Sequence, residues 1–216
     1  MNEKLTEMVF ILDASGSMAG LEEDTIGGFN AMIERQRSEE GIAYVSTVLF
    51  SNESHVLHDR VPLDKIGEMT RKDYRVGGCT ALIDAIGQAI HHIGNVHKYA
   101  REEDVPAHTV FVITTDGMEN ASHRYSADEV RRIVERQKEK YGWEFLFLAA
   151  NIDAVETAGR FGINATHSTN FINDSHGQEL MYEAVSHVVA NVRANRPMNA
   201  QWKQKVEEDH VRRSRK

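Results

Sequence analysis

Continuous apolar runs alternate with amphipathic segments along most of this chain, and this alternation strongly limits its possible folds. Five runs are expected to be strands: residues 8–12, 42–50, 55–61, 109–113 and 144–149. Most of these runs lack the one-sided alternation of a sheet that faces water, so they are typical of strands buried on both faces. The run at 55–61 is more polar and is followed by Pro62, which suits the edge of a sheet.

Between these runs lie segments with apolar side chains at helical spacing. They cover residues 21–37, 81–99, 126–140, 154–161 and 178–194. In the 81–99 segment, Leu82, Ile86 and Ile90 recur every four residues. Ser126 and Glu129 have the spacing of a capping box at a helix start. Strands that alternate with helices predict an α/β fold with three layers, α/β/α, around a mainly parallel central sheet.

Length and composition point to a single domain. The chain has 216 residues, and 25 Lys and Arg against 33 Asp and Glu give a formal net charge of −8. This length suits one large domain, which we expect to cover residues 1–195. Residues 196–216 contain few apolar side chains and end in a basic run, so we expect a flexible C-terminal tail.

Several features indicate the compartment and exclude some partners. The single cysteine, Cys79, cannot form an internal disulfide, which fits a reducing compartment. The first seven residues are mostly polar, unlike a secretory leader, and no stretch approaches the roughly 20 apolar residues that span a bilayer. The acidic net charge argues against nucleic acid as a partner. We therefore expect a cytoplasmic protein that binds neither membrane nor nucleic acid.

Oxygen-bearing side chains follow the ends of the expected strands. Asp13, Ser15 and Ser17 come directly after the first strand, Thr80 precedes the 81–99 helix, and Asp116 follows the 109–113 strand. In open parallel sheets, ligands bind at the carboxyl ends of the strands. A set of two carboxylates and three hydroxyls suits a hard divalent cation. The sequence therefore predicts a site for Mg²⁺, for which Mn²⁺ could substitute.

The three segments together resemble the metal-ion-dependent adhesion site of the von Willebrand factor A (VWA) domain. The matching residues are Asp13-x-Ser15-x-Ser17, Thr80 and Asp116-Gly117. The integrin inserted domain belongs to the same family, and the likeness extends over roughly residues 5–194. The resemblance implies a Rossmann-like VWA fold, whose mostly parallel sheet has one antiparallel edge strand. It also implies that Ser15 and Ser17 bind the metal directly, Thr80 directly or through water, and the two aspartates largely through water.

The resemblance also implies a function. Neutral hydroxyls around the cation leave much of its charge uncompensated, so the metal attracts an acidic group from outside. In the VWA family that group is typically an Asp or Glu carboxylate of a protein partner. We expect a metal-dependent protein–protein binding module. The likeness to stand-alone prokaryotic and phage members suggests cytoplasmic assembly or scaffolding.

Residues near the expected metal site form a candidate rim for partner contact. They are Met18, Leu21, Glu119, Asn120, His123, Asn151 and Asp153. Each of them could equally be an ordinary loop residue. Exposure of Met18 and Leu21 would favour a protein interface at this rim.

Two other function classes remain open. A metal-dependent hydrolase or phosphatase would use the same cation to activate water. The sequence lacks the second aspartate of a haloacid-dehalogenase-type phosphotransferase, because Ser15 occupies that position, and it lacks the Gly-x-Ser-x-Gly motif of serine hydrolases. We therefore expect no enzyme activity and assign no catalytic residue. The remaining alternative is a purely structural α/β scaffold.

Overall fold

Six strands form one mixed sheet in the computed structural model, which describes residues 1–214. The strands are β1 (Asn2–Asp13), β2 (Ile42–Phe50), β3 (Ser54–Pro62), β4 (Pro106–Thr115), β5 (Glu144–Ala149) and β6 (Ser168–Asn170). Their order is β3-β2-β1-β4-β5-β6. Strand β3 runs antiparallel to β2, and the other neighbouring strands pair in parallel. The predicted mostly parallel sheet with one antiparallel edge strand is therefore confirmed.

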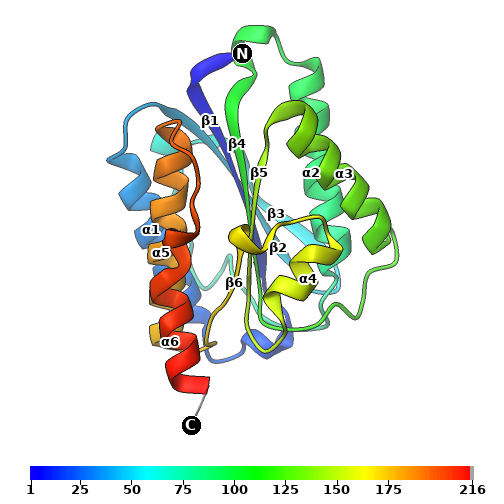
Figure 1. Ribbon diagram of the computed structural model, residues 1–216, viewed down its shortest axis with the longest axis vertical. Helices are drawn as coiled ribbons and strands as arrows, with labels where there is room; N and C mark the ends of the chain where they lie inside the picture. The colour runs from blue at the N-terminus through cyan, green and yellow to red at the C-terminus, as the bar shows by residue number, and fades with distance from the viewer. Residues whose placement is uncertain (215–216) are drawn as a thin grey trace.

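Helices cover both faces of this sheet. They are α1 (Glu22–Arg37), α2 (Leu82–Tyr99), α3 (Ala127–Tyr141), α4 (Ala154–Arg160), α5 (Ser175–Arg193) and α6 (Gln204–Ser214). Short 3-10 turns are η1 (Gly16–Met18), η2 (Leu63–Lys65), η3 (Glu102–Asp104), η4 (Ala165–His167) and η5 (Ala200–Lys203). Helices α1, α5 and α6 lie on one side of the sheet, and α2, α3 and α4 lie on the other (Figure 1). The capping box at Ser126 and Glu129 is present at the start of α3.

The sequence of the central strand β1 explains the two-sided core. Met8, Phe10 and Leu12 are buried in the cluster that includes α1 and α5. The alternate residues Val9 and Ile11 are buried in the cluster that includes α2, α3 and α4. Because successive strand side chains point to opposite faces, a strand covered on both sides must be apolar at nearly every position.

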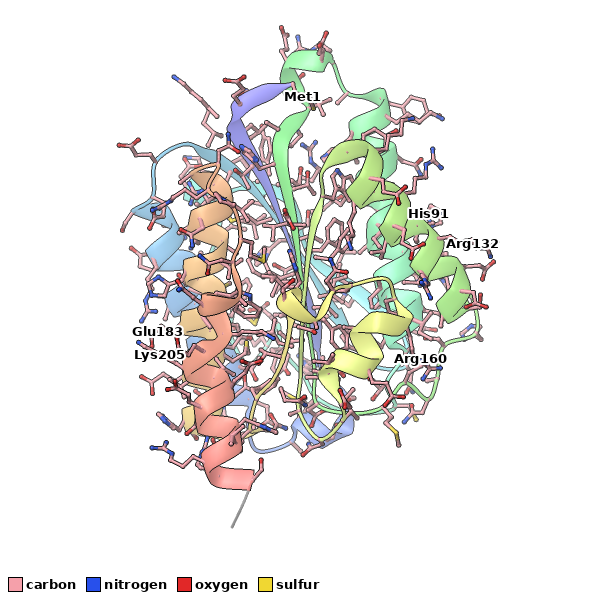
Figure 2. The ribbon with its side chains drawn as sticks, in the orientation of Figure 1. Met1, His91, Arg132, Arg160, Glu183 and Lys205 are labelled. Carbon is pink, nitrogen blue, oxygen red and sulfur yellow. The ribbon has the colours of Figure 1, made fainter. Side chains whose placement is uncertain are left out.

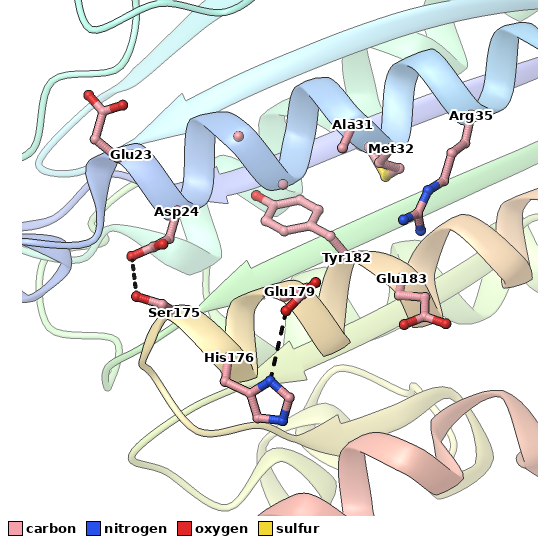
Figure 3. A pocket seen from close by; sticks show the side chains of 12 residues that line it. Glu23, Asp24, Ala31, Met32, Arg35, Ser175, His176, Glu179, Tyr182 and Glu183 are labelled. Atoms are coloured by element: carbon pink, nitrogen blue, oxygen red, sulfur yellow. Dashed lines mark hydrogen bonds and ion pairs between the residues drawn. The ribbon is translucent and has the colours of Figure 1, made fainter.

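Helices α1 and α5 approach closely at one glycine. A Cβ atom at Gly28 would lie 2.2 Å from Cδ2 of Tyr182, so the ring of Tyr182 packs directly against the α1 backbone. Figure 3 shows Tyr182 projecting from α5 toward α1. Near the N-terminal ends of the two helices, the hydroxyl of Ser175 donates to Asp24 at 2.9 Å. The groove between the two helices has a volume of about 540 Å³.

The C-terminal segment differs from the expected flexible tail. Residues 200–214 form η5 and α6, and α6 packs against α5 and β6. Val206 of α6 is buried, and Lys203 of η5 donates to the carbonyls of Ala165 at 2.8 Å and Ser168 at 2.9 Å. Lys205 of α6 also pairs with Glu183 of α5 at 3.2 Å (Figure 2).

The prediction of a flexible tail is therefore wrong for η5 and α6, while residues 215–216 lie outside the described part of the chain. The helix was missed because it docks mainly through charged side chains and one buried valine, which leave little apolar periodicity in the sequence.

Other elements also differ from the sequence expectation: β1 begins at Asn2 rather than at 8, and β4 covers Pro106–Thr115 rather than 109–113. The short strand β6 was not predicted, because three residues are too few to show a strand pattern. Helix α5 begins at Ser175 rather than at 178, since the Asp174 side chain accepts from the Gly177 amide and caps the helix. Within residues 1–214, no helix combines the length and the apolar character needed to cross a membrane.

Candidate metal centre

The five predicted metal-site residues meet at the carboxyl ends of β1 and β4. Asp13 ends β1, and Asp116 follows the last residue of β4. Because β1 and β4 are parallel neighbours, both aspartates lie at the same edge of the sheet. The loop before Thr80 is tied to the first loop, since the Gly16 amide donates to the Gly78 carbonyl at 3.1 Å. The positive φ of 78° at Gly78 suits glycine at this close approach.

The three hydroxyls lie together at this edge. The Oγ atoms of Ser15 and Ser17 are 3.0 Å apart, and the Ser17 hydroxyl donates to Oδ1 of Asp116 at 2.6 Å. A Cβ atom at Gly117 would lie 3.8 Å from Ser17 Oγ and 3.9 Å from Thr80 Oγ1, so both hydroxyls border the Gly117 backbone. The structure therefore brings together the hydroxyls that the sequence assigned to the metal.

Asp13 is held in place by its own loop and by β4. Its Oδ1 accepts from the Ser15 amide at 2.8 Å, and its Oδ2 accepts from the Thr115 hydroxyl at 2.7 Å. The Tyr74 hydroxyl donates to the Asp13 carbonyl. Asp13 is buried, so these donors compensate for the water that its carboxylate loses on folding.

The electrostatics of the second carboxylate fit a cation. Burial raises the pKa of Asp116, and the nearby Asp13 carboxylate raises this pKa further, while hydrogen bonds from Ser17 and Asn173 oppose the shift. Two buried carboxylates therefore repel one another at this edge of the sheet. A divalent cation would offset that repulsion, and the hydroxyl and carboxylate oxygens are the donors that hard cations prefer. The residues present thus fit a hard divalent metal.

The predicted rim is only partly exposed. Met18 is only 4% exposed, because the η1 turn places it in the interior, so it lacks the exposure that would favour a protein interface. Leu21 is half-buried and directly precedes α1. Four of the predicted rim residues are exposed: Asn120, His123, Asn151 and Asp153. Met118, which was not predicted, is 73% exposed beside the Asp116-Gly117 turn.

Several rim side chains also hold the loops in place. Glu119 accepts from the Ile83 amide at 2.8 Å and thereby ties its loop to the first turn of α2. Asn120 accepts from the Thr80 amide at 2.8 Å. The Asn151 amide donates to the Asp116 carbonyl at 3.1 Å, and Asp153 caps α4. These contacts give the rim a structural role whether or not a partner touches it.

Sequence reasoning missed Asn173, Thr115 and Tyr74. The Asn173 amide donates to Oδ2 of Asp116 at 2.9 Å, while Thr115 and Tyr74 hold Asp13. Asn173 lies in the loop after β6, and this loop reaches the site because β6 ends at the same edge as β5. The polar pair Asn173-Asp174 was a usable signal, but it could not be recognised as a loop at a strand end without β6.

The cavity between α1 and α5 is separate from this centre. Its lining residues come from those two helices, with Ser175 and His176 at the start of α5 (Figure 3). None of the five predicted metal ligands lines it.

Comparison with known proteins supports the VWA assignment. Similar folds occur in proximal thread matrix protein 1 from the mussel byssus, with TM-score 0.58, 13% identity, and coverage of 86% of this chain and 46% of that chain. One structure of that protein has a zinc-occupied MIDAS motif. The manganese-loaded TRAP protein of Plasmodium vivax matches with TM-score 0.55 and 15% identity over 83% of this chain and 73% of that chain.

A further solved structure has a similar fold. A von Willebrand factor type A protein from Catenulispora acidiphila has TM-score 0.57 and 13% identity over 88% of this chain and 43% of that chain. This chain thus spans less than half the length of the byssus and Catenulispora proteins. No functionally curated protein matches it.

A family model described as "VWA domain containing CoxE-like protein" matches residues 2–156. The chain therefore belongs to the VWA domain family of CoxE-like proteins.

Proposed function

We propose that this chain is a divalent-metal-dependent protein-binding module. Asp13, Ser15, Ser17, Thr80 and Asp116 would hold Mg²⁺, or Mn²⁺ in its place, and the site would capture an Asp or Glu carboxylate of a protein partner. The observation that supports this most is the hydrogen bond from Ser17 to Asp116 at 2.6 Å. With its one proton given to Asp116, the Ser17 hydroxyl can accept from Ser15 with one lone pair and still has a second lone pair for a cation.

The bound metal would supply positive charge that attracts a carboxylate. The chain's own residues determine how much of that charge stays available. Both oxygens of Asp13 accept hydrogen bonds from this chain, as do both oxygens of Asp116. With both carboxylates engaged in this way, Ser15, Ser17 and Thr80 would supply the neutral donors, and an outside carboxylate would complete the charge balance.

The same contacts favour binding over turnover. A general base needs a carboxylate within reach of the proton it removes and available to accept it, whereas both aspartates here already accept hydrogen bonds within the protein. We propose a binding role in assembly or scaffolding, and we propose the cytoplasm as its compartment because the single cysteine, Cys79, fits a reducing environment. Since the net charge is −8, we propose a protein partner rather than nucleic acid.

The test is a peptide-display selection on immobilised protein in Mg²⁺, with bound peptides released by a chelator. The proposal predicts that released peptides share an Asp or Glu, and that changing this residue to Asn or Gln abolishes binding. The Asp116→Ala variant should select no such peptides. Binding that survives chelation would favour a metal-independent scaffold. Metal-dependent hydrolysis of p-nitrophenyl phosphate that Asp13→Ala abolishes would favour the enzyme alternative.

A further inference from the structure

Two amide side chains connect α5 to the metal centre. The Asn173 amide nitrogen donates to Oδ2 of Asp116 at 2.9 Å. The Asn173 amide oxygen accepts from Nε2 of Gln178, in the first turns of α5, at 3.0 Å. The other carboxylate oxygen of Asp116 already accepts from Ser17. Asp116 is therefore held from both sides, by Ser17 from the first loop and by Asn173 from the loop after β6.

The charge of Asp116 sets the direction of these hydrogen bonds. An ionised carboxylate only accepts hydrogen bonds, so Asn173 must turn its NH₂ group toward Asp116 and its oxygen toward Gln178. Gln178 must then donate, which leaves its own oxygen facing the interior. That Oε1 atom has no hydrogen-bond partner among the described residues. Water cannot readily reach it, because Gln178 is only 2% exposed.

An unpaired buried acceptor is unfavourable and calls for an explanation. A reversed amide pair would put the Asn173 oxygen against the Asp116 carboxylate, where two acceptors repel. The unpaired oxygen of Gln178 is thus the consequence of presenting a donor to Asp116. The hydrogen bond from Asn173 to Asp116 is thus made while Oε1 of Gln178 stays without a hydrogen-bond partner.

The loop that carries Asn173 is firmly positioned. Asp174 caps α5 by accepting from the Gly177 amide at 2.8 Å, and it also pairs with Arg213 of α6. A Cβ atom at Gly177 would lie 1.8 Å from the Ile172 carbonyl oxygen, so the loop packs directly onto the first turn of α5. Asn173 therefore projects toward Asp116 from a loop that is fixed on both sides.

We propose that Asn173 is a positioning residue of the metal centre and that Gln178 orients its amide. Asn173 holds Oδ2 of Asp116 while Ser17 holds Oδ1, and together they fix the orientation of this carboxylate for a bound cation. The inference rests on the proposed metal binding. It adds to the proposed metal centre a residue that lies outside the three motif segments. It also specifies the orientation of the Asn173 amide, which Gln178 of α5 fixes.

The experiment titrates Mg²⁺ and Mn²⁺ by calorimetry into chelator-treated wild type, Asn173→Ala and Asn173→Leu. Changes to residues that hydrogen-bond metal ligands typically weaken metal affinity about 10-fold or more, and we expect that loss in both variants. The leucine variant keeps roughly the volume of the side chain but cannot donate, so it separates hydrogen bonding from packing. Both variants leave Oδ2 of Asp116 and Nε2 of Gln178 without this partner, so each should lower the melting temperature without metal, while its circular dichroism spectrum should remain that of the folded wild type.

Two further variants make the test specific. Gln178→Met keeps the size of the side chain and removes the amide that orients Asn173, so metal binding should weaken less than in Asn173→Ala. Asn199→Ala removes an asparagine that caps the η5 turn and should bind metal as wild type does. The electron paramagnetic resonance spectrum of bound Mn²⁺ should change in the Asn173 variants and remain unchanged in Asn199→Ala.

Each result has a distinct meaning. If wild type binds neither cation, the proposed function and this inference both fail. If wild type binds and both Asn173 variants bind equally well, only the inference fails. Normal affinity in Asn173→Leu with weak affinity in Asn173→Ala would assign Asn173 a packing role and would also overturn it.

Discussion

At the scale of single residues, the contact between α1 and α5 depends on the absence of one side chain. The ring of Tyr182 occupies the space that a Cβ atom at Gly28 would need. The neighbouring Gly27, in the same helix, has no atom within 4 Å of its Cβ position. Glycine in a helix interior lowers stability relative to alanine, so the two positions should respond to the same substitution in opposite directions.

We predict that Gly28→Ala lowers the free energy of unfolding by about 1–3 kcal/mol, because a ring in a packed core must shift. Gly27→Ala should raise the free energy of unfolding by roughly 0.5–1 kcal/mol, since it adds helix propensity and no contact. Urea unfolding followed by circular dichroism measures both changes. A change of the same sign in the two variants would contradict the close packing described here.

At the scale of elements, α6 is held mainly by charge. Burial by itself would raise the pKa of Asp209, but hydrogen bonds from Arg213 and Arg212 outweigh burial and hold this pKa below its usual value. The pKa of Asp174 is lowered in the same way, with burial opposed by Arg213 and the Gly177 amide. A carboxylate with a depressed pKa stabilises the fold above its unfolded pKa and loses this effect as the pH falls through its folded pKa.

We therefore predict that α6 detaches on acidification, beginning below about pH 4, where unfolded aspartates protonate. Trp202 reports this change because its indole donates to the Thr166 carbonyl at 2.9 Å just before α6. The fluorescence difference between wild type and Trp202→Phe follows Trp202 alone. Arg213→Ala should loosen α6 at neutral pH and remove most of the acid-dependent change. An identical pH profile in Arg213→Ala would contradict this account of α6 docking.

The elements also show which parts of the fold could be predicted. Strand β2 and strand β5 begin and end at the expected residues, because a strand covered on both faces is apolar at most positions. Helix α2 was expected because its buried face is long and regular. Strand β6 and helix α6 were missed since neither needs an apolar pattern: β6 has three residues, and α6 is held largely by Arg213, Lys203 and their partners.

At the scale of the whole molecule, the candidate centre joins loops that are far apart in sequence. The sequence could predict that Asp13, Thr80 and Asp116 lie close together, because parallel neighbouring strands end at one edge of the sheet and all three residues lie in recognisable motifs. Asn173 could not be placed in the same way. Its hydrogen bond to Asp116 depends on the position of the loop between β6 and α5, and only the folded structure shows that position. The same assembly buried Met18, which the sequence suggested as a partner contact.

Metal binding to this assembled site must stabilise the whole molecule. A ligand that binds only the folded state at 100 times its Kd adds about 2.7 kcal/mol to the free energy of unfolding. For a chain of this size, that corresponds to a rise in melting temperature of roughly 5–10 °C. We predict such a rise when Mg²⁺ or Mn²⁺ is added to chelator-treated protein, and none in Asp116→Ala. Equal shifts in both proteins would mean that the cation binds elsewhere.

Metal binding at the three loops is tested most directly by a calorimetric titration of Mg²⁺, and separately of Mn²⁺, into chelator-treated wild type, Ser15→Ala and Asp116→Ala. We expect one site per chain in wild type, with binding lost or strongly weakened in both variants. Ser186→Ala, a change in α5 away from the three loops, serves as the control and should bind as wild type does. Wild-type binding that persists unchanged in Ser15→Ala and Asp116→Ala would contradict the assignment of the metal centre to these loops.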